Sequence, residues 1–193
     1  MSWTAIVPLK AAAERKQRLA EVLDLPERIA LSEAMARHVL ATLRAVPAIA
    51  DIRLLSPEPL NGTDVPWLAD HGAELNAALE TAVSTLGARP VLIVHADLPL
   101  LDAADVQCLI DGAATAGCVI AANRHGHGTN AIALADPRGF RFHFGADSLN
   151  RHLAEAGPAC ALIERTGLAF DCDTPDDLEA IRARYTEDKP KEQ

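Results

Sequence analysis

The stretch VLIVHADLPL (Val91–Leu100) decides the fold class, because a run of apolar residues leads directly into an acidic turn closed by proline. A short, continuously apolar run is typical of a strand that a sheet buries on both faces, so we expect a strand over Val91–His95. Similar runs predict further strands at Ala5–Pro8, Ile52–Leu55, Val119–Ala122 and Ala131–Leu134.

Longer amphipathic stretches separate these strands and predict helices. Asp102 stands three residues before Asp105, which is a helix-start pattern, and Thr174 followed by Pro175 predicts another start. Alternating strands and helices indicate an α/β domain with a mostly parallel sheet, whose ligand site lies beyond the carboxyl ends of the strands. The expected helices cover Glu27–Arg44, Leu75–Leu86, Asp102–Leu109, Leu149–Ala156 and Pro175–Tyr185, and Ser56–Gly72 is expected to be one long loop.

The composition favours one globular domain over residues 1–185, followed by a charged and disordered tail at 186–193. A net charge of −9 argues against nucleic acid or an anionic membrane as a partner. The sequence contains no apolar run long enough for a membrane span and no signal peptide, so we expect a cytoplasmic protein. Its four cysteines lack metal-type spacing and are expected to be reduced.

Four cations follow the first strand within nine positions: Lys10, Arg15, Lys16 and Arg18. In so acidic a chain, such a group is suited to a triphosphate, because lysine supplies a point charge and arginine a bidentate fork. The alternative is a helix start whose cations face water. The stretch lacks the glycine-rich P-loop pattern.

Three aspartates occupy positions suited to a hard cation. Asp97 ends the buried strand, and Asp171 and Asp173 have the spacing that directs both side chains to one side of an extended segment. Two like charges held close together are costly unless a cation neutralises them. The alternative for Asp97 is a side chain that caps its turn. Asp176 and Asp177 are interpreted as first-turn acids of a helix and are left out of the site.

Two glycine-containing segments are suited to anions. Asn123–Asn130 contains glycines that let backbone N–H groups turn toward an anion, and Thr129 adds a hydroxyl. Phe142–Ser148 leads into a helix for which Ser148 is the expected N-cap, and the free N–H groups of such a helix start attract phosphate or carboxylate. A hairpin turn and an ordinary helix cap are the respective alternatives.

Taken in order, these segments resemble the family of phospholactate or phosphoenolpyruvate guanylyltransferases, which supply the GDP-linked precursor of the deazaflavin cofactor. The resemblance extends from about Ile6 to Tyr185. It rests on Val7-Pro-Leu-Lys10, Lys16-Gln-Arg-Leu19, Leu75-Asn-Ala-Ala-Leu79, Ala96-Asp-Leu-Pro99, Arg124-His-Gly-His-Gly-Thr-Asn130, Phe144-Gly145 with Ser148, and Asp171-Cys-Asp-Thr-Pro175.

The resemblance implies a three-layer α/β/α nucleotidyltransferase domain with a Rossmann-like sheet. It also implies a set of site residues: Mg²⁺ on Asp97, Asp171 and Asp173; the acceptor near Thr129, Gly145 and Ser148; the nucleotide near Pro8, Leu9, Lys10, Lys16, Arg18, Leu75 and Asn76; and catalytic roles for Lys10, Lys16 and Asp97. The chain departs from the family pattern at Gln17, where a small hydroxyl residue is usual, and at Ala73-Glu74, where glycine is usual.

The implied reaction transfers GMP from GTP to a small phosphorylated acid and releases pyrophosphate. A phosphomonoester is already anionic at neutral pH because its second pKa is about 6, so no general base is required. The sequence leaves open whether the acceptor is 2-phospho-L-lactate, phosphoenolpyruvate or 3-phosphoglycerate.

Two other functions remain open at this stage. One is a cytidylyl- or molybdopterin-type nucleotidyltransferase that uses the same fold on another acceptor. The other is a nucleotide-binding protein without turnover, against which the retention of all three aspartates argues. The sequence is compatible with a homodimer and does not determine the oligomeric state.

Overall fold

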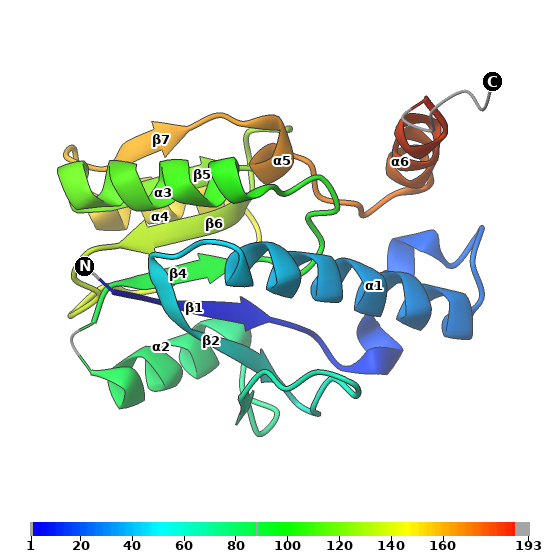
Figure 1. The fold of residues 1–193 in the computed structure, drawn as a ribbon, viewed down its shortest axis with the longest axis horizontal. Coiled ribbons are helices and arrows are strands. Elements are labelled where there is room, and N and C mark those ends of the chain that lie inside the picture. Colours follow the sequence, from blue (N-terminus) through cyan, green and yellow to red (C-terminus); the bar gives the residue numbers. More distant parts are fainter. Residues whose placement is uncertain (1, 88, 188–193) are drawn as a thin grey trace.

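The computed structural model describes residues 2–87 and 89–187, and a seven-stranded sheet forms its centre (Figure 1). The strand order is β3-β2-β1-β4-β6-β5-β7. Neighbouring strands pair in parallel except β6, which is antiparallel to both β4 and β5. The strands are β1 (Trp3–Pro8), β2 (Ile49–Ser56), β3 (Trp67–Ala69), β4 (Val91–Val94), β5 (Cys118–Ala122), β6 (Thr129–Leu134) and β7 (Ala161–Ile163).

The sheet confirms the predicted class and corrects two of its details. All five predicted strands are present, but the segment predicted as one loop, Ser56–Gly72, contributes the short edge strand β3. The other edge strand, β7, was also not predicted. Both edge strands are only three residues long and partly exposed, and an apolar run this short is a weak signal for a strand.

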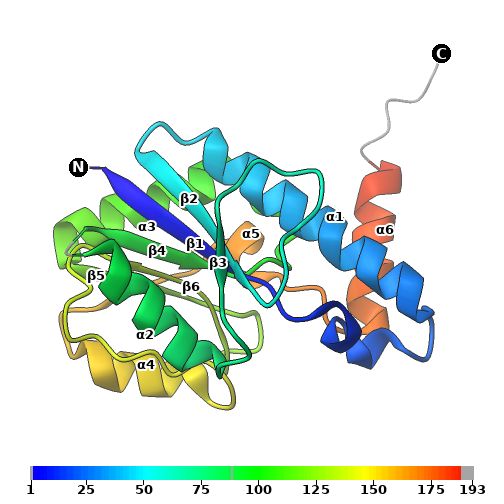
Figure 2. The same ribbon diagram turned by 90° about the horizontal axis from the view of Figure 1, so that it is seen from below.

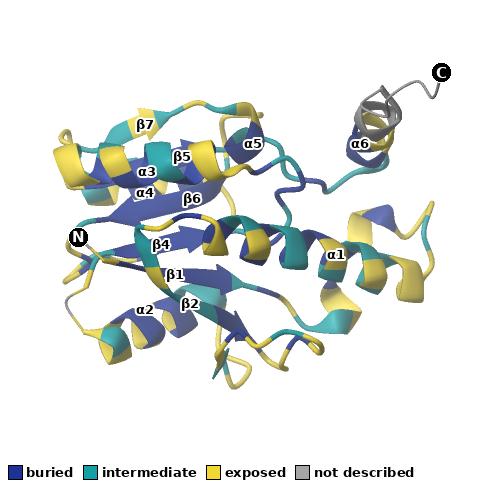
Figure 3. Ribbon diagram, viewed as in Figure 1, coloured by how far each residue is buried: buried dark blue, intermediate teal, exposed yellow. Residues whose placement is uncertain are grey.

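Helices cover both faces of the sheet and complete three layers (Figures 1 and 2). One core packs the first and third helices against one face, and a second core packs the second and fourth helices against the other. Figure 3 shows the buried strands between these helices and the exposed outer helix surfaces. The helices are α1 (Leu25–Arg44), α2 (Leu75–Leu86), α3 (Ala103–Ala116), α4 (Ser148–Ala156), α5 (Thr166–Ala169) and α6 (Pro175–Glu187).

Local side-chain caps explain where the first and third helices begin. Asp24 caps α1 with a reciprocal bond from Glu27, so this helix begins two residues before its predicted start. Asp102 and Asp105 form the same reciprocal cap on α3, which confirms the predicted start of that helix.

The last helix stands beyond the carboxyl ends of the central strands rather than over the sheet (Figure 2). It packs into a third, small core that holds Leu19, Met35, Cys172, Leu178 and Ile181. Helix α6 continues to Glu187, two residues into the predicted tail, and residues 188–193 lie outside the described part. No helix within the described ranges is long and apolar enough to cross a membrane.

Candidate functional site

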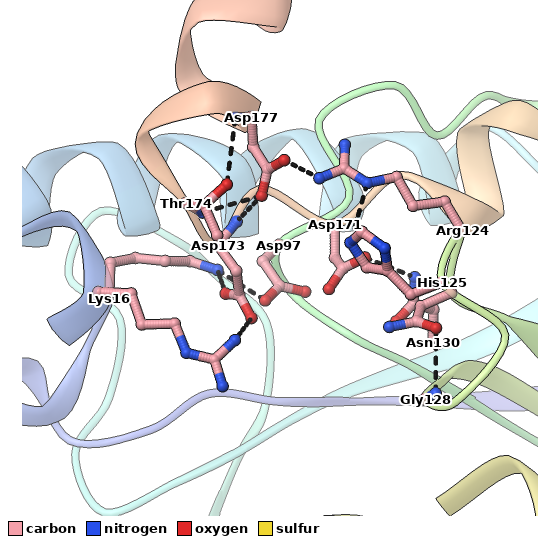
Figure 4. Close-up of polar contacts among 12 residues, drawn as sticks. Lys16, Asp97, Arg124, His125, Gly128, Asn130, Asp171, Asp173, Thr174 and Asp177 are labelled. Carbon is pink, nitrogen blue, oxygen red and sulfur yellow. Dashed lines mark hydrogen bonds and ion pairs between the residues drawn. The ribbon is translucent and has the colours of Figure 1, made fainter. Parts of the chain in front are cut away.

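The predicted site segments meet at one edge of the sheet, where β1, β4 and β5 end (Figure 4). Since β6 is antiparallel to its neighbours, its first residues, Thr129 and Asn130, lie at that same edge. Two backbone hydrogen bonds tie the segments together: Cys172 N–H donates to Asp97 O at 3.1 Å, and His95 N–H donates to Asn130 O at 3.0 Å. Segments from four parts of the chain therefore form one site.

A charged cluster, made of Lys16, Asp97 and Asp173, lies in this site. Lys16 Nζ is 2.7 Å from Asp97 Oδ2 and 2.8 Å from Asp173 Oδ1, and the lysine side chain is only 6% exposed. Burial opposes the charge on Lys16, but the two carboxylates outweigh it and raise the pKa of the ammonium group. Burial likewise opposes the charge on Asp97, while Lys16 lowers the pKa of that carboxyl group. Lys16 and Asp97 are therefore both charged at neutral pH.

One oxygen of the charged cluster has no partner. Asp97 Oδ1 is buried and makes no hydrogen bond within the described part of the chain. A buried carboxylate oxygen without a hydrogen-bond partner destabilises the folded protein. Such an oxygen is a suitable ligand for a hard cation. Asp97 and Asp173 thus fit the predicted cation in their chemistry, although the described residues contain no preformed group of three or more acidic, histidine or cysteine side chains placed to hold a metal ion.

The third predicted metal ligand, Asp171, is held differently from the other two. It flanks Cys172, opposite Asp173, and its Oδ1 is 3.4 Å from the Asn130 amide nitrogen. Among the described residues, Lys16 forms ion pairs with Asp97 and Asp173 but not with Asp171. The set of three ligands therefore remains a prediction.

Asp177 positions the charged cluster, although the sequence argument left it out of the site. Its buried carboxylate accepts hydrogen bonds from the backbone N–H groups of Asp173 at 2.9 Å and Thr174 at 2.8 Å. The same carboxylate pairs with Arg124, whose guanidinium lies 4.6 Å from the centre of the Phe170 ring. Asp177 stands three residues after Thr174, the same spacing as from Asp102 to Asp105, and this spacing is the signal that could have identified its role.

A neutral network of hydrogen bonds forms the other half of the site and consists of Thr129, Ser148, His152 and the backbone of His143. Thr129 N–H donates to Ser148 Oγ at 2.9 Å, and the Thr129 hydroxyl lies 3.0 Å from His152 Nδ1. His152 Nε2 accepts from His143 N–H at 2.8 Å, so the neutral ring carries its proton on Nδ1 and donates it to Thr129. Burial, assisted by the charges of His143, His95 and Arg151, lowers the pKa of His152 to about 4.

The structure corrects the predicted helix cap at Ser148. Asp147, in a left-handed conformation and without a capping side chain, is the N-cap of α4, and Ser148 is the first helical residue. The Ser148 side chain is buried because it accepts the hydrogen bond from Thr129. The prediction that Thr129 and Ser148 act together is consistent with this geometry, but the reason given for Ser148 was wrong.

Asn76 connects helix α2 to this network. Its side-chain oxygen accepts from Phe144 N–H at 2.7 Å, and its nitrogen donates to Phe144 O at 3.1 Å. This reciprocal pair fixes the backbone next to Gly145, whose φ of +118° is unfavourable for residues with a side chain. Asn76 therefore positions the Phe144–Gly145 turn, and Leu75 precedes it as the first residue of α2.

The four cations of the first loop do not gather on one anion site. Arg15 points inward, where its Nε donates to Lys10 O at 2.8 Å and its guanidinium is 3.6 Å from Glu33 and 3.5 Å from Glu58. It therefore holds the loop in place instead of facing a ligand. The side chain of Arg18 is 77% exposed and lies 3.9 Å from Asp173.

The remaining predicted nucleotide contacts lie where the first strand ends. Pro8 is the last residue of β1, Leu9 is buried and donates its N–H to Leu55 O at 2.8 Å, and Lys10 is exposed. Two surface hollows, of about 520 and 470 Å³, lie elsewhere, beside Glu80 and Phe140 and beside Asp105 and Arg165 respectively. Neither is lined by the residues of the charged cluster or the neutral network.

Comparison with known proteins identifies the family of this chain. The family model described as "Guanylyl transferase CofC like" matches residues 3–192. A phosphoenolpyruvate guanylyltransferase of Conexibacter woesei is 39% identical over 196 residues, covering 94% of this chain and 88% of the relative. One of Chloroflexus aurantiacus is 36% identical over 187 residues, covering 90% and 91%.

Solved structures agree in fold. The 2-C-methyl-D-erythritol 4-phosphate cytidylyltransferase of Thermus thermophilus has a TM-score of 0.62 at 16% identity, covering 96% of this chain and 100% of that one. The 4-diphosphocytidyl-2C-methyl-D-erythritol synthase of Anaerococcus prevotii has a TM-score of 0.65 at 12% identity, covering 96% of each. Identities this low support the nucleotidyltransferase fold alone. On the family model and the relatives together, the chain belongs to the CofC-like guanylyl transferase family.

Proposed function

We propose that the protein transfers GMP from GTP to phosphoenolpyruvate or a closely similar phosphorylated acid and so forms a GDP-linked precursor of the deazaflavin cofactor. The charged cluster is the observation that carries this proposal: two carboxylates converge on a buried lysine, and Asp97 Oδ1 has no hydrogen-bond partner among the described residues. The relatives named phosphoenolpyruvate guanylyltransferase support the choice of acceptor.

The proposal includes Mg²⁺ as the cofactor. Asp97 and Asp173 would hold it with Asp171, because carboxylate oxygens are the ligands that this ion prefers. When bound, the ion would neutralise negative charge on the phosphates of the nucleotide.

The reaction requires that the anionic phosphate of the acceptor approach the anionic triphosphate of GTP. An oxygen of the acceptor's phosphate attacks the α-phosphorus of GTP, a new P–O bond forms, and the bond to the departing pyrophosphate breaks. Lys16 would stabilise the charge that accumulates on the phosphates, with Arg18 and Lys10 at the exposed end of the triphosphate.

The neutral network is suited to the acceptor. Because His152 donates to Thr129 Oγ1, the threonine hydroxyl retains its own proton for donation to a carboxylate or phosphate oxygen. Ser148, which accepts from Thr129 N–H, has the same capacity. Gly145, fixed through Asn76, supplies a backbone without a side chain beside them.

A matrix of substrates tests this function directly. The purified chain is incubated with Mg²⁺, one of GTP, ATP or CTP, and one of phosphoenolpyruvate, 2-phospho-L-lactate or 3-phosphoglycerate, and the products are identified by mass spectrometry. We expect a GDP-linked acid from GTP with phosphoenolpyruvate or 2-phospho-L-lactate. A cytidylyl product without a guanylyl product would instead support the other nucleotidyltransferase class, whose fold the chain shares.

The same matrix tests for a nucleotide-binding protein without turnover, which would show stabilisation by GTP and no product with any acid. Since GTP is a cytoplasmic metabolite, the proposal places the protein in the cytoplasm. It includes a homodimer as a further expectation, and size-exclusion chromatography with light scattering measures the oligomeric state.

A further inference from the structure

Two cysteines outside the proposed site lie in contact, although they are 42 positions apart in the sequence. Cys118 is the first residue of β5, and Cys160 immediately precedes β7. Their Sγ atoms are 3.0 Å apart. All four cysteines of the chain are free thiols in the structure, as the sequence argument expected.

The register of the sheet places these cysteines together independently of their side-chain conformations. Strands β5 and β7 are parallel, and their ladder begins with Val119 opposite Ala161. Cys118 and Cys160 each lie one position before this pair, so they are neighbours across the two strands. Adjacent strands are about 4.8 Å apart, which falls within the range of separations that a disulfide can join.

Both side chains also point to the same face of the sheet. Cys118 belongs to the core under α2 and α4, and Cys160 packs against the same core. Gly157 ends α4, and Cys160 N–H donates to Gly157 O at 3.2 Å, so a tight turn holds the second thiol in place. The backbone thus already has the arrangement that a cross-link requires.

We propose that Cys118 and Cys160 form a dithiol site that low-molecular-weight disulfides oxidise reversibly to an intramolecular disulfide. Cys160 reacts first, because it is partly exposed whereas Cys118 is buried. The hydrogen bond between the two thiols also lowers the pKa of Cys160, which favours its reactive thiolate.

Glutathione disulfide would oxidise the two thiols in two steps of thiol–disulfide exchange. The Cys160 thiolate attacks one sulfur of the oxidant, which forms a mixed disulfide and releases one glutathione. The Cys118 thiolate then attacks the Cys160 sulfur, which forms the protein disulfide and releases the second glutathione. Two thiol protons and two electrons leave the protein, and the oxidant is reduced to two thiols.

The cross-link is expected to stabilise the fold without altering the proposed site. Cys118 begins β5, whereas the loop of the proposed site follows the opposite end of that strand at Ala122. A disulfide would tie the short edge strand β7 and the end of α4 to the interior of the sheet. Because it closes a loop of 42 positions, we expect the midpoint of thermal unfolding to rise by roughly 5–10 °C.

The test uses the full chain, excess glutathione disulfide, alkylation of the remaining thiols, and intact and peptide mass spectrometry. We expect the loss of two thiols, a mass decrease of about 2 Da, a peptide pair joining Cys118 to Cys160, and reversal by dithiothreitol. Each of three results would overturn the proposal: four thiols that stay free under excess oxidant, glutathione adducts that are not converted to a protein disulfide, or a disulfide that involves Cys108 or Cys172.

Matched variants separate the dithiol from the other cysteines. Cys108→Ser should retain the cross-link and the rise in thermal midpoint, because Cys108 lies in α3, outside the pair. Cys118→Ser should stop at a glutathione adduct on Cys160, and Cys160→Ser should lose both the cross-link and the rise. If either serine variant fails to fold, the peptide map of the unchanged protein still decides the question.

Discussion

The two halves of the site are held by different forces. In the charged cluster, Lys16 bridges Asp97 and Asp173, and one buried carboxylate oxygen lacks a hydrogen-bond partner in the part of the chain that the structure describes. In the neutral network, Thr129, Ser148 and His152 are joined by neutral hydrogen bonds, with His152 using both ring nitrogens. The charged cluster can therefore still bind a charged ligand. In the neutral network, most hydrogen-bonding groups already have partners within the protein.

This difference assigns separate tasks to the two halves. Charges brought together at a buried position cost free energy that a bound cation or phosphate can recover, so the charged cluster is suited to chemistry. A network of satisfied hydrogen bonds fixes the orientation of its hydroxyl groups and is suited to positioning a substrate. Changes in the charged cluster should therefore lower turnover, whereas changes in the neutral network should alter stability and substrate affinity.

The largest effect is expected for Asp97→Asn. The change keeps the shape of the side chain but removes the negative charge that pairs with Lys16 and would bind the proposed cation. We therefore expect kcat/KM for guanylyl transfer to fall by about 100-fold or more. Pyrophosphate release measures the rate, and circular dichroism checks that the fold is retained. Asp111→Asn, on the exposed face of α3, is the matched control. Near-normal turnover in Asp97→Asn would remove the charged cluster from the mechanism.

A smaller loss is expected for Lys16→Met, about 10- to 100-fold in kcat/KM, because one cation facing the phosphates is removed. The same change frees both carboxylates, so the affinity for Mn²⁺ without nucleotide should increase when measured by electron paramagnetic resonance. Lys10→Met provides the comparison, since Lys10 is exposed and should have a weaker effect on both quantities. An unchanged Mn²⁺ affinity in Lys16→Met would show that the lysine and the cation do not share these carboxylates.

The neutral network predicts a dependence of stability on pH. Because the folded pKa of His152 is about 4, below its ordinary value of 6.5, its contribution is complete above pH 6.5 and is lost as pH falls toward 4. The free energy of unfolding should decrease by on the order of 3 kcal/mol over this window. Urea unfolding at several pH values measures the change.

A comparison with His152→Leu isolates this contribution from the other titrating groups nearby, which are His143, His95 and Glu155, with Arg151 as a fixed charge. The variant should be less stable at pH 7 but should show a shallower loss of stability from pH 6.5 to 4. Equal pH slopes in both proteins would mean that His152 is not the group responsible.

The smallest effect is expected for Asn76→Ala. The change removes both hydrogen bonds to the Phe144 backbone, which should cost about 1–2 kcal/mol of stability and loosen the turn at Gly145. We expect KM to rise a few-fold while kcat changes little. Asn150→Ala, an exposed residue that bonds Asp147, is the control. A loss confined to kcat would assign Asn76 to the chemistry instead of to positioning.

Several features of the site were predictable because their signals are local. The apolar run before Asp97, the spacing of Asp171 and Asp173, and the start of α6 at Thr174 each depend on neighbours in the sequence. Their meeting at one sheet edge follows from the general rule for parallel strands. The family resemblance identified the same segments, and the family model confirms it.

Other features depended on distant contacts and could not be predicted. Arg15 and Lys16 are adjacent cations, yet Arg15 points toward Glu33 and Glu58 while Lys16 points toward the two aspartates. A left-handed backbone at Lys16, with φ of +52°, helps to direct the two side chains differently. Nothing in the local sequence indicates that conformation.

The sequence by itself determined the α/β class, the strands of the sheet interior and the segments that supply the site, because local periodicity and spacing encode these features. Only the tertiary structure decided that Asp177 pairs with Arg124, that His152 donates to Thr129, and that Cys118 meets Cys160. The physical reason is that hydrogen bonds and ion pairs extend over only a few ångströms in space. Residues far apart in the chain reach that distance only after the sheet has set their register.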